Sequence, residues 1–349
     1  MTTDATPHQD RIVAICGATG GIGEALVDVY AAPGTELLLA GRRTEALARL
    51  KSAAEAKGAV VRTAAFDLRD RVALEAWCEE AARCGTDILI LGAGVSASVE
   101  GRRIGEVGKD GNGGEAVEAK VEGEKGRNAG EDLLWLPERN DDLLRELDVN
   151  ATGNILAANA FVRALLLARA EGAVPVKHVQ VAFVASLAAL TGLPGSPGYS
   201  ASKAALRTYG EALRRLLRGK DVGVTVLLPG YVESDMSRRY QGSKPWLMSA
   251  EKAARLMKHA IDAGKREYAF PKILAIGIAL LKLVPASLEH LFLNGFFFTV
   301  EPDRESRKES GTESCSKKVA EGQQEKKASA RSRGNSSVTE NDVDRGASR

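Results

Sequence analysis

The chain has 349 residues, 44% of them hydrophobic and 27% charged, which is enough apolar content to bury a substantial core. Its 48 basic and 46 acidic side chains leave a formal net charge of +2, which gives no electrostatic reason to expect nucleic acid as a partner. The 4 cysteines and 4 histidines form neither a CxxC pair nor a ligand cluster. This usage argues against a disulfide framework and against a metal site, and it fits a reducing, cytoplasmic compartment.

Residues 11–91 alternate between short apolar runs and longer stretches rich in Ala, Leu and Glu. The apolar runs predict buried strands at Arg11–Cys16, Glu36–Ala40, Val60–Phe66 and Asp87–Leu91. The stretches between them have helical spacing and predict helices at Gly21–Ala32, Arg43–Lys57 and Asp70–Arg83. A strand–helix–strand repeat of this kind predicts a parallel sheet covered by helices on both faces.

Two polar stretches interrupt this alternation. Residues 98–140 are rich in Gly, Glu and Lys, with no aromatic residue before Trp135, and this composition predicts a flexible insertion in one loop. Residues 302–349 form a Ser/Glu/Lys/Arg stretch that predicts a disordered tail. Between them the pattern resumes, with helices at Asp141–Ala170, Tyr199–Arg218 and Ser249–Ala263 and strands at Val179–Ala185 and Val222–Leu228. We therefore expect one doubly wound α/β domain of the Rossmann type over residues 1–301.

Residues 273–300 are strongly apolar and contain the run Phe296–Phe298. Polar or helix-breaking residues interrupt them too early for a membrane-spanning helix, namely Lys282, Pro285, Glu289 and His290. Two interpretations remain open. The stretch forms helices that pack over a substrate pocket or at a subunit contact, or it forms an anchor that lies on a membrane surface and delivers a lipophilic substrate.

A glycine-rich turn joins the first predicted strand to the first predicted helix. Free backbone N–H groups and the helix dipole at such a turn favour a pyrophosphate. Gly17 permits the tight turn, Gly21 lets the backbone approach a phosphate, and Gly23 lets helix and strand pack closely. A glycine-rich loop is by itself weak support, but its position after the first strand favours dinucleotide binding. The candidate cofactor contacts in this turn are Gly17, Thr19, Gly20, Gly21, Ile22 and Gly23.

The second predicted strand ends beside Arg42 and Arg43. An NAD-binding site has an acidic residue here, which accepts a hydrogen bond from the ribose 2′-OH. Two guanidinium groups would instead bind a 2′-phosphate, so the sequence favours NADP(H). The alternative is that both arginines are solvated residues that open a helix.

The strongest chemical signal lies between Ser186 and Lys203. Ser186 follows a predicted strand, and Tyr199 and Lys203 lie one turn apart at the start of the next predicted helix. A phenol has an ordinary pKa of about 10, and a nearby ammonium lowers that pKa towards the range of a useful acid or base. Lys203 can also bind the ribose, and Ser186 can hold the substrate oxygen. A YxxxK pair by itself is common on surface helices, so the serine and the upstream glycine turn are essential to this interpretation.

With these motifs the chain resembles the short-chain dehydrogenase/reductase family, in its compact one-domain branch, from Arg11 to Phe270 apart from the insertion. The spacing of Gly17, Gly21 and Gly23 is the one found in that branch. The resemblance implies a proton-relay role for Asn150 beside Ser186, Tyr199 and Lys203. It also implies cofactor contacts by Asp67, Leu68, Gly92, Ala93, Gly94, Tyr199, Lys203, Val232 and Ser234. The chain departs from the family in having Cys16 where Thr is usual, and Leu91-Gly92-Ala93-Gly94 where Asn-Asn-Ala-Gly is usual.

The resemblance implies an NADP(H)-dependent oxidoreductase that interconverts a carbonyl and a primary or secondary alcohol. Its partner would be a small-molecule substrate, which the apolar stretch at 273–300 suggests is lipophilic. Homodimers or homotetramers are expected, since helices such as Asn150–Ala170 and Tyr199–Arg218 pair between subunits in the family. Two alternatives remain: a dinucleotide-binding regulator without turnover, and a membrane-surface scaffold on the same fold.

Overall fold

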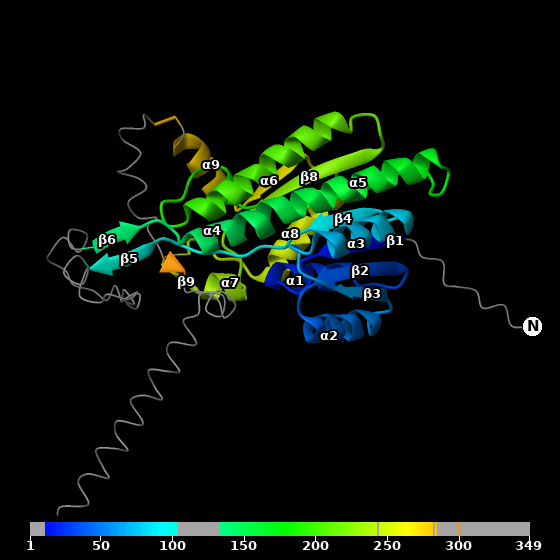
Figure 1. Cartoon of the computed structure of the whole chain (residues 1–349), viewed down its shortest axis with the longest axis horizontal. Helices are drawn as coiled ribbons and strands as arrows, with labels where there is room; N and C mark the ends of the chain where they lie inside the picture. Colours follow the sequence, from blue (N-terminus) through cyan, green and yellow to red (C-terminus); the bar gives the residue numbers. More distant parts are fainter. Residues whose placement is uncertain (1–10, 104–132, 243, 282, 285–298, 301–349) are drawn as a thin grey trace, which may run out of the picture. The chain divides into compact units, whose positions relative to one another are not determined.

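The computed structural model describes residues 11–103, 133–242, 244–281, 283–284 and 299–300. The chain divides into two units, Met1–Glu301 and Pro302–Arg349, and every described residue belongs to the first (Figure 1). The predicted tail at 302–349 and most of the predicted insertion at 98–140 therefore lie outside the described residues.

A seven-stranded parallel sheet forms the centre of this unit, in the order β10-β8-β7-β4-β1-β2-β3 (Figure 1). Its strands are β1 Arg11–Cys16, β2 Thr35–Gly41, β3 Val60–Ala65, β4 Ile88–Leu91, β7 Val179–Val184, β8 Val222–Pro229 and β10 Glu267–Phe270. The chain runs outwards from β1 to β3 and then returns to β4 on the other side of β1. The strand order reverses there, and ligands of open α/β sheets bind outside the carboxyl ends of the strands at such a point. The doubly wound fold predicted from the sequence is confirmed.

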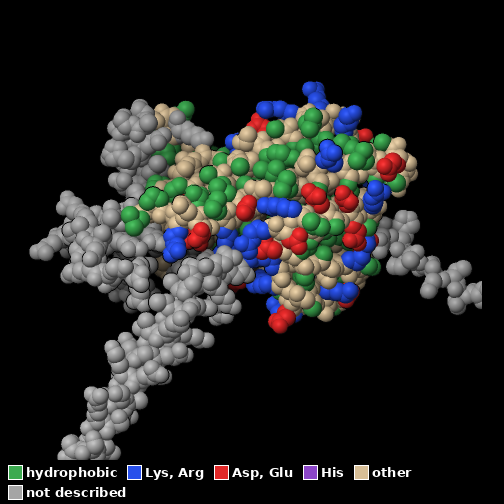
Figure 2. Space-filling view, in the orientation of Figure 1, with side chains coloured by type: hydrophobic (Ala, Val, Ile, Leu, Met, Phe, Trp, Pro, Cys, Tyr) green, Lys and Arg blue, Asp and Glu red, His purple; other side chains and the backbone are tan. Residues whose placement is uncertain are grey.

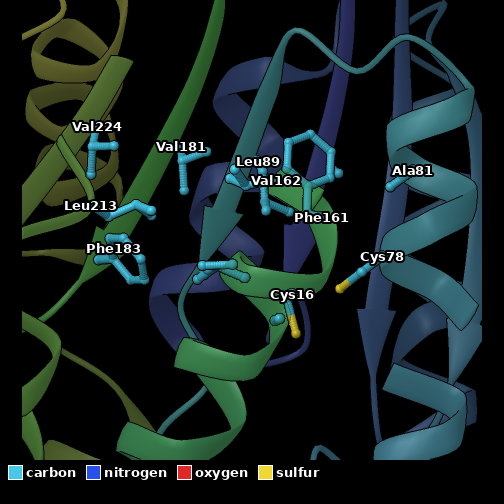
Figure 3. Close-up of a cluster of buried hydrophobic side chains, with 14 of the residues drawn as sticks. Cys16, Cys78, Ala81, Leu89, Phe161, Val162, Val181, Phe183, Leu213 and Val224 are labelled. Carbon is cyan, nitrogen blue, oxygen red and sulfur yellow. The ribbon is translucent and has the colours of Figure 1, made fainter. Parts of the chain in front are cut away.

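Two hydrophobic cores lie on opposite faces of the sheet. Along β1, Ala14 and Cys16 belong to one core and Val13 and Ile15 to the other, because successive side chains of a strand point to opposite faces. The first core packs β-strand residues against α3 Arg71–Arg83, α5 Asn154–Ala170 and α6 Pro197–Leu216. Figure 3 shows part of it, with Cys16 beside Cys78 of α3 and Phe161 and Val162 of α5. The second core includes residues of α1 Gly21–Tyr30, α2 Thr44–Glu55 and α8 Ala250–Asp262.

The long predicted helix at 141–170 has three parts. α4 Asn140–Glu146 continues through a π-helical segment, Leu147–Gly153, into α5. π-Helical turns are rare and are often found at functional sites. Short helices at Leu187–Ala189 and α7 Asp235–Arg238 were not predicted, nor was the four-residue edge strand β10.

Secondary structure differs from the predictions at the borders of the insertion, residues 98–140, and at the end of the apolar stretch, residues 273–300. At the borders of the predicted flexible insertion, β5 Glu100–Arg103 pairs with β6 Leu133–Leu136 in an antiparallel ladder, because backbone hydrogen bonding needs no apolar sequence. In the apolar stretch at 273–300, α9 Lys272–Leu281 is helical as predicted. The prediction of helix up to residue 300 is wrong, since β11 Thr299–Val300 pairs with β9 Tyr240–Gln241. Residues 285–298 lie outside the described residues.

Candidate functional site

The glycine turn between β1 and α1 folds back on itself and is held by backbone hydrogen bonds. Gly17 has a φ of 85°, and a Cβ added there would lie 2.5 Å from the backbone nitrogen of Ala93. The N–H groups of Gly17 and Ala18 both donate to the carbonyl of Ala40, each at 2.9 Å. Gly20 precedes α1 with extended backbone and offers no side-chain cap. The first amides of α1 therefore have no side-chain acceptor from the preceding residue, which is the arrangement that an anion site at a helix N-terminus needs.

Two further glycines allow close approaches around this turn. A Cβ on Gly23 would lie 2.1 Å from the carbonyl oxygen of Gly17, so only glycine fits there. A Cβ on Gly21 would lie 2.8 Å from the Cβ of Ser234. Ser234 comes from the segment after β8, and its side chain caps α7 by accepting from Ser237 N at 3.1 Å. The fold therefore brings Gly21 and Ser234, two predicted cofactor contacts, side by side.

The arginines at the end of β2 point back to the glycine turn. The guanidinium of Arg43 donates to the backbone carbonyl of Thr19. Thr19 is a buried residue. The same guanidinium also lies 3.7 Å from Glu24 and 4.0 Å from Asp235, and the Arg43 side chain is 53% exposed. Arg42 lies 3.8 Å from the carboxylate of Asp67. Arg43 therefore contacts the glycine turn and Arg42 contacts Asp67, while Arg43 is also the exposed residue that precedes α2, so both interpretations of the arginines stay open.

Asp67 and Leu68 come shortly after β3, at the same edge of the sheet as the glycine turn. The carboxylate of Asp67 accepts from Arg69 N at 2.8 Å and from Arg69 Nε at 3.1 Å. Partial burial works to raise the pKa of Asp67, but these bonds and the charges of Arg69 and Arg42 hold it below its usual value. Leu68 is buried, and a Cβ on Gly153 would lie 3.0 Å from the Leu68 side chain. Leu68 thus packs against the π-helical segment that carries Asn150.

The segment after β4 runs between the turn and the catalytic candidates. Gly92 donates to the carbonyl of Cys16 at 2.9 Å, and Ala93 accepts from Asn154 Nδ2 at 3.1 Å. A Cβ on Gly94 would lie 3.3 Å from Lys203 Nζ and 3.4 Å from Asn150 Oδ1. Asn154 was not predicted. It ties this segment to α5 where the family's asparagine pair is missing, and its position one helical turn after Asn150 is the signal that could have identified it.

Asn150 is fully buried and bonds the same segment on both sides. Its Oδ1 accepts from Val95 N at 2.7 Å, and its Nδ2 donates to Val95 O at 2.9 Å. Nδ2 also lies 3.1 Å from Ser202 Oγ. Ser202 belongs to α6, so Asn150 connects the segment after β4 to the helix that carries Tyr199 and Lys203.

Ser186, Tyr199 and Lys203 gather at the carboxyl end of β7. Lys203 is 4% exposed, donates from Nζ to the carbonyl of Val184 at 3.1 Å, and lies 5.6 Å from the centroid of the Tyr199 ring. Ser186 accepts from Ala188 N at 3.1 Å, and a hydrogen bond between Ser186 and Tyr199 lowers the pKa of the phenol. The three side chains that the sequence selected are therefore neighbours.

The ionisation of Tyr199 differs from the expectation. Burial raises the pKa of Tyr199 to about 12, with further increases from the charges of Glu146 and Tyr231. Burial also lowers the pKa of Lys203 to about 8, while Glu146 opposes that shift. The direction of the shift in the Tyr199 pKa is the opposite of the expected lowering. The physical reason is that desolvation of the buried phenol, which disfavours the phenolate, is the largest contribution.

Val232 and two tyrosines border the site on the β8 side. Val232 is buried and forms a parallel bridge with Met248. The hydroxyl groups of Tyr231 and Tyr240 are 3.0 Å apart, and the rings meet edge to face at 5.3 Å. This tyrosine pair was not predicted, and its partner Tyr240 comes from a stretch in which the sequence shows no motif.

Within the described part of the chain, no group of three or more His, Cys, Asp or Glu side chains is arranged to hold a metal ion. One helical run there, Asn140–Ala170, is long and apolar enough to cross a membrane by length and composition. Half of its most apolar window is buried inside the protein, as in a core helix.

Comparisons with known proteins agree with this geometry. A family profile described as short chain dehydrogenase matches residues 11–107 and 128–244. An uncharacterized oxidoreductase of Myxococcus xanthus is 30% identical over 280 residues, which cover 80% of this chain and 94% of that protein. Dehydrogenase/reductase SDR family member 7B of Bos taurus is 27% identical over 237 residues, and the match spans only 60% of its length.

Two solved structures show the same fold. A short chain dehydrogenase/reductase from Burkholderia phymatum in complex with NAD has a TM-score of 0.61 at 20% identity, covering 85% of this chain and 99% of that one. A short chain dehydrogenase from Burkholderia cenocepacia in complex with NADP has a TM-score of 0.56 at 19% identity, covering 76% and 97%. The two neighbours hold different dinucleotides, so the fold by itself does not select one.

Proposed function

Because the chain belongs to the short-chain dehydrogenase/reductase family, we propose that it is an NADP(H)-dependent enzyme that interconverts a carbonyl and a primary or secondary alcohol. One observation carries the proposal. Lys203 and Asn150 lie against Gly94, on the segment that continues from the strand beside the glycine turn. Lys203 in turn lies 5.6 Å from the ring centroid of Tyr199, and Tyr199 is hydrogen-bonded to Ser186. A dinucleotide bound at that turn and a substrate at Tyr199 would share one site.

The residues of the glycine turn fit the cofactor. The approach of Gly23 to Gly17, the open amides at the start of α1 and the guanidinium of Arg43 at Thr19 provide a close backbone surface with positive charge. NADP(H), when bound, supplies or accepts the hydride. The fit supports phosphate recognition by Arg42 and Arg43 and dinucleotide contacts by the predicted residues around them.

The catalytic side chains then handle the substrate oxygen and its proton. Ser186 holds the oxygen, and Tyr199 donates a proton to it in reduction or accepts one in oxidation. With its pKa raised to about 12 by burial, Tyr199 is protonated at neutral pH and can donate its proton in carbonyl reduction. The ammonium of Lys203 binds the ribose. Asn150 keeps the segment after β4 in place beside Lys203. The part of Asn150 in a proton relay rests on the resemblance to the family.

A cofactor titration tests the choice of dinucleotide. We expect NADPH to bind more tightly than NADH, and Arg42→Ala with Arg43→Ala to remove that preference. Losing the two charge-assisted contacts should weaken NADPH binding by about 3 kcal/mol, roughly a hundredfold. The matched control is Arg49→Ala with Lys51→Ala, which removes two cations from α2 away from the glycine turn. Equal affinity of the wild-type protein for both dinucleotides would show that the arginines do not recognise a phosphate.

A carbonyl screen with NADPH tests turnover. Tyr199→Phe removes the transferable proton and should reduce kcat by about a hundredfold or more. Tyr209→Phe is the matched control, because Tyr209 lies on the same helix and packs edge-on against Phe183, away from the site. Tight NADPH binding without turnover of any carbonyl or alcohol would favour the dinucleotide-binding regulator.

The surface of α9 supports a lipophilic substrate and contact with a membrane surface. The inner face of the helix packs towards the site, since a Cβ on Gly230 would lie 3.5 Å from Leu274. The outer face exposes Ile273, Ile276 and Leu280, each by more than half. We expect the protein to float with phosphatidylcholine vesicles, and replacement of these three residues by serine to abolish flotation. The control is Val72→Ser, at an exposed valine of α3. Flotation that persists in the triple variant would exclude α9 as the contact.

We also propose that copies of the chain form a homodimer or homotetramer through α5 and α6. Leu167 and Leu216 are exposed on these helices, and Figure 2 shows apolar side chains gathered over them. Sedimentation of the wild-type protein should give a dimer or tetramer, and Leu167→Glu with Leu216→Glu should give a smaller species. A monomeric wild-type protein would contradict it.

A further inference from the structure

A buried carboxyl lies near the start of α6, beside the residue that precedes Tyr199, and takes no part in the proposed proton transfer. Glu146, the last residue of α4, is 1% exposed. Its Oε1 accepts from Ala97 N at 2.6 Å. Its Oε2 is buried and has no hydrogen-bond partner among the described residues. Burying such an oxygen without a partner is costly, and a glutamine could serve Ala97 equally well.

The unpartnered oxygen points to the residue that precedes Tyr199. A Cβ on Gly198 would lie 2.6 Å from Glu146 Oε2 and 3.0 Å from Glu138 Oε2. Glu138 is also buried, and its carboxylate accepts from Gly198 N at 3.0–3.1 Å. Two carboxyl groups therefore meet at the first turn of α6, and the glycine makes room for both.

Glu146 also belongs to the same framework as Asn150. The two residues lie four positions apart in the continuous run from α4 into the π-helical segment. They bond successive points of the segment after β4, with Asn150 holding Val95 and Glu146 holding Ala97. The carboxyl is thus fixed in position relative to Lys203, and no side-chain movement is needed for its charge to act on the site.

We propose that Glu146 is a positioning residue whose ionisation controls how readily Tyr199 releases its proton, an inference that rests on the proposed function of the site. The titratable and charged groups that face it are Glu138 and Asp142 on its own side and Lys203 and Tyr199 on α6. Burial, with Glu138 and Asp142, raises the pKa of Glu146 to about 8, while Lys203 works against that increase.

The sign of the effect follows from these charges. Well below pH 8 the Glu146 carboxyl is mostly neutral, so its charge contributes little to the pKa of Tyr199. Above pH 8 it becomes a carboxylate, and a negative charge beside the phenol disfavours the phenolate. Glu146 therefore restrains alcohol oxidation, which needs the phenolate, only on the alkaline side. A purely structural role would change the rate at every pH.

The kinetic test compares Glu146→Gln with wild type over a range of pH. Gln keeps an acceptor for Ala97 and removes the charge. Above pH 8 we expect the variant to oxidise alcohol faster by up to about tenfold, which corresponds to one pKa unit. At pH 7 the two should have equal kcat/KM, and their affinities for NADPH should match. Asp141→Asn, which removes an exposed charge of the same sign from α4, should behave as wild type. Coinciding profiles, or a loss of rate at all pH values, would overturn the proposal.

A second measurement needs no substrate and separates this inference from the proposed function. In protein labelled with ¹³C at glutamate carboxyls, the Glu146 resonance is identified by its loss in Glu146→Gln, or in Glu146→Asp if the first variant does not fold. It should titrate near pH 8, and Lys203→Met should raise that midpoint by about one unit, because an opposing cation is removed. An ordinary midpoint, or none of the shift in Lys203→Met, would overturn the proposal. The expected shift without turnover of any substrate would support the coupling and refute the proposed function alone.

Discussion

Adding a single methyl group at Gly23 perturbs the glycine turn without changing any charge. In Gly23→Ala the new carbon would lie 2.1 Å from Gly17 O and 2.9 Å from the carbonyl carbon and oxygen of Ala18. The first contact is more than an ångström inside ordinary van der Waals distance, and all three atoms are backbone, so no side chain can rotate away. Either α1 moves off β1 or the turn opens.

The size of the effect follows from two opposing contributions. Forcing a methyl group into a packed region costs about 1–3 kcal/mol, and alanine in place of glycine within a helix returns at most about 1 kcal/mol. We expect the free energy of unfolding to fall by about 1–2 kcal/mol. Moving the turn also misplaces the amides at the start of α1. The loss in NADPH binding free energy should therefore be larger than the loss in unfolding free energy.

Urea unfolding and NADPH fluorescence titration measure the two quantities on the same samples. The matched control is Gly192→Ala, because a Cβ there meets nothing within 4 Å and the backbone does not have positive φ. Gly23→Ala with wild-type stability and wild-type affinity would refute the close approach of α1 to the turn. Lost stability with unchanged affinity would refute the placement of the phosphate there.

Three further changes test the surrounding framework. Asp70→Ala removes the side-chain cap of α3, and urea unfolding should show a loss of about 1 kcal/mol. Asn154→Ala removes the buried donor to the carbonyls of Ala93, Val149 and Asn150. It should cost about 1–3 kcal/mol in unfolding free energy and lower kcat. Partial burial works to raise the pKa of Asp262, but hydrogen bonds from Lys258 and Arg11 hold that pKa below its usual value. The ionised carboxylate therefore stabilises the folded protein at neutral pH, and this contribution is lost on acidification. Asp262→Asn should therefore be less stable than wild type at pH 7, and the difference in urea midpoint should shrink as the pH falls through about 4; a constant difference would contradict the assignment.

The sequence by itself determined most of the fold. Strands that are buried on both faces appear as continuous apolar runs, which is why β1 was predicted at its observed bounds and β2, β4, β7 and β8 within a residue of theirs. The edge strand β3 was also predicted within a residue, although most of its side chains are exposed. The candidate site was also local in sequence. Ser186, Tyr199 and Lys203 lie on one strand end and one helix turn, so their spacing contains the information. β10 was missed because this edge strand is fully buried only at Phe270, so its sequence shows no continuous apolar run of the kind that revealed β4.

Only the tertiary structure decided what surrounds these residues. Ser234 reaches Gly21, and Glu138 reaches Gly198, across long separations in the chain. No local pattern records such contacts, because they depend on how the sheet aligns the ends of its strands. The same reason explains the ionisation of Tyr199: its residue type and spacing mark it as an acid or base, but its pKa depends on burial and on the charge of Glu146, which the fold brings beside it. The sequence determined which groups could react, and the three-dimensional packing decided in which protonation state they meet.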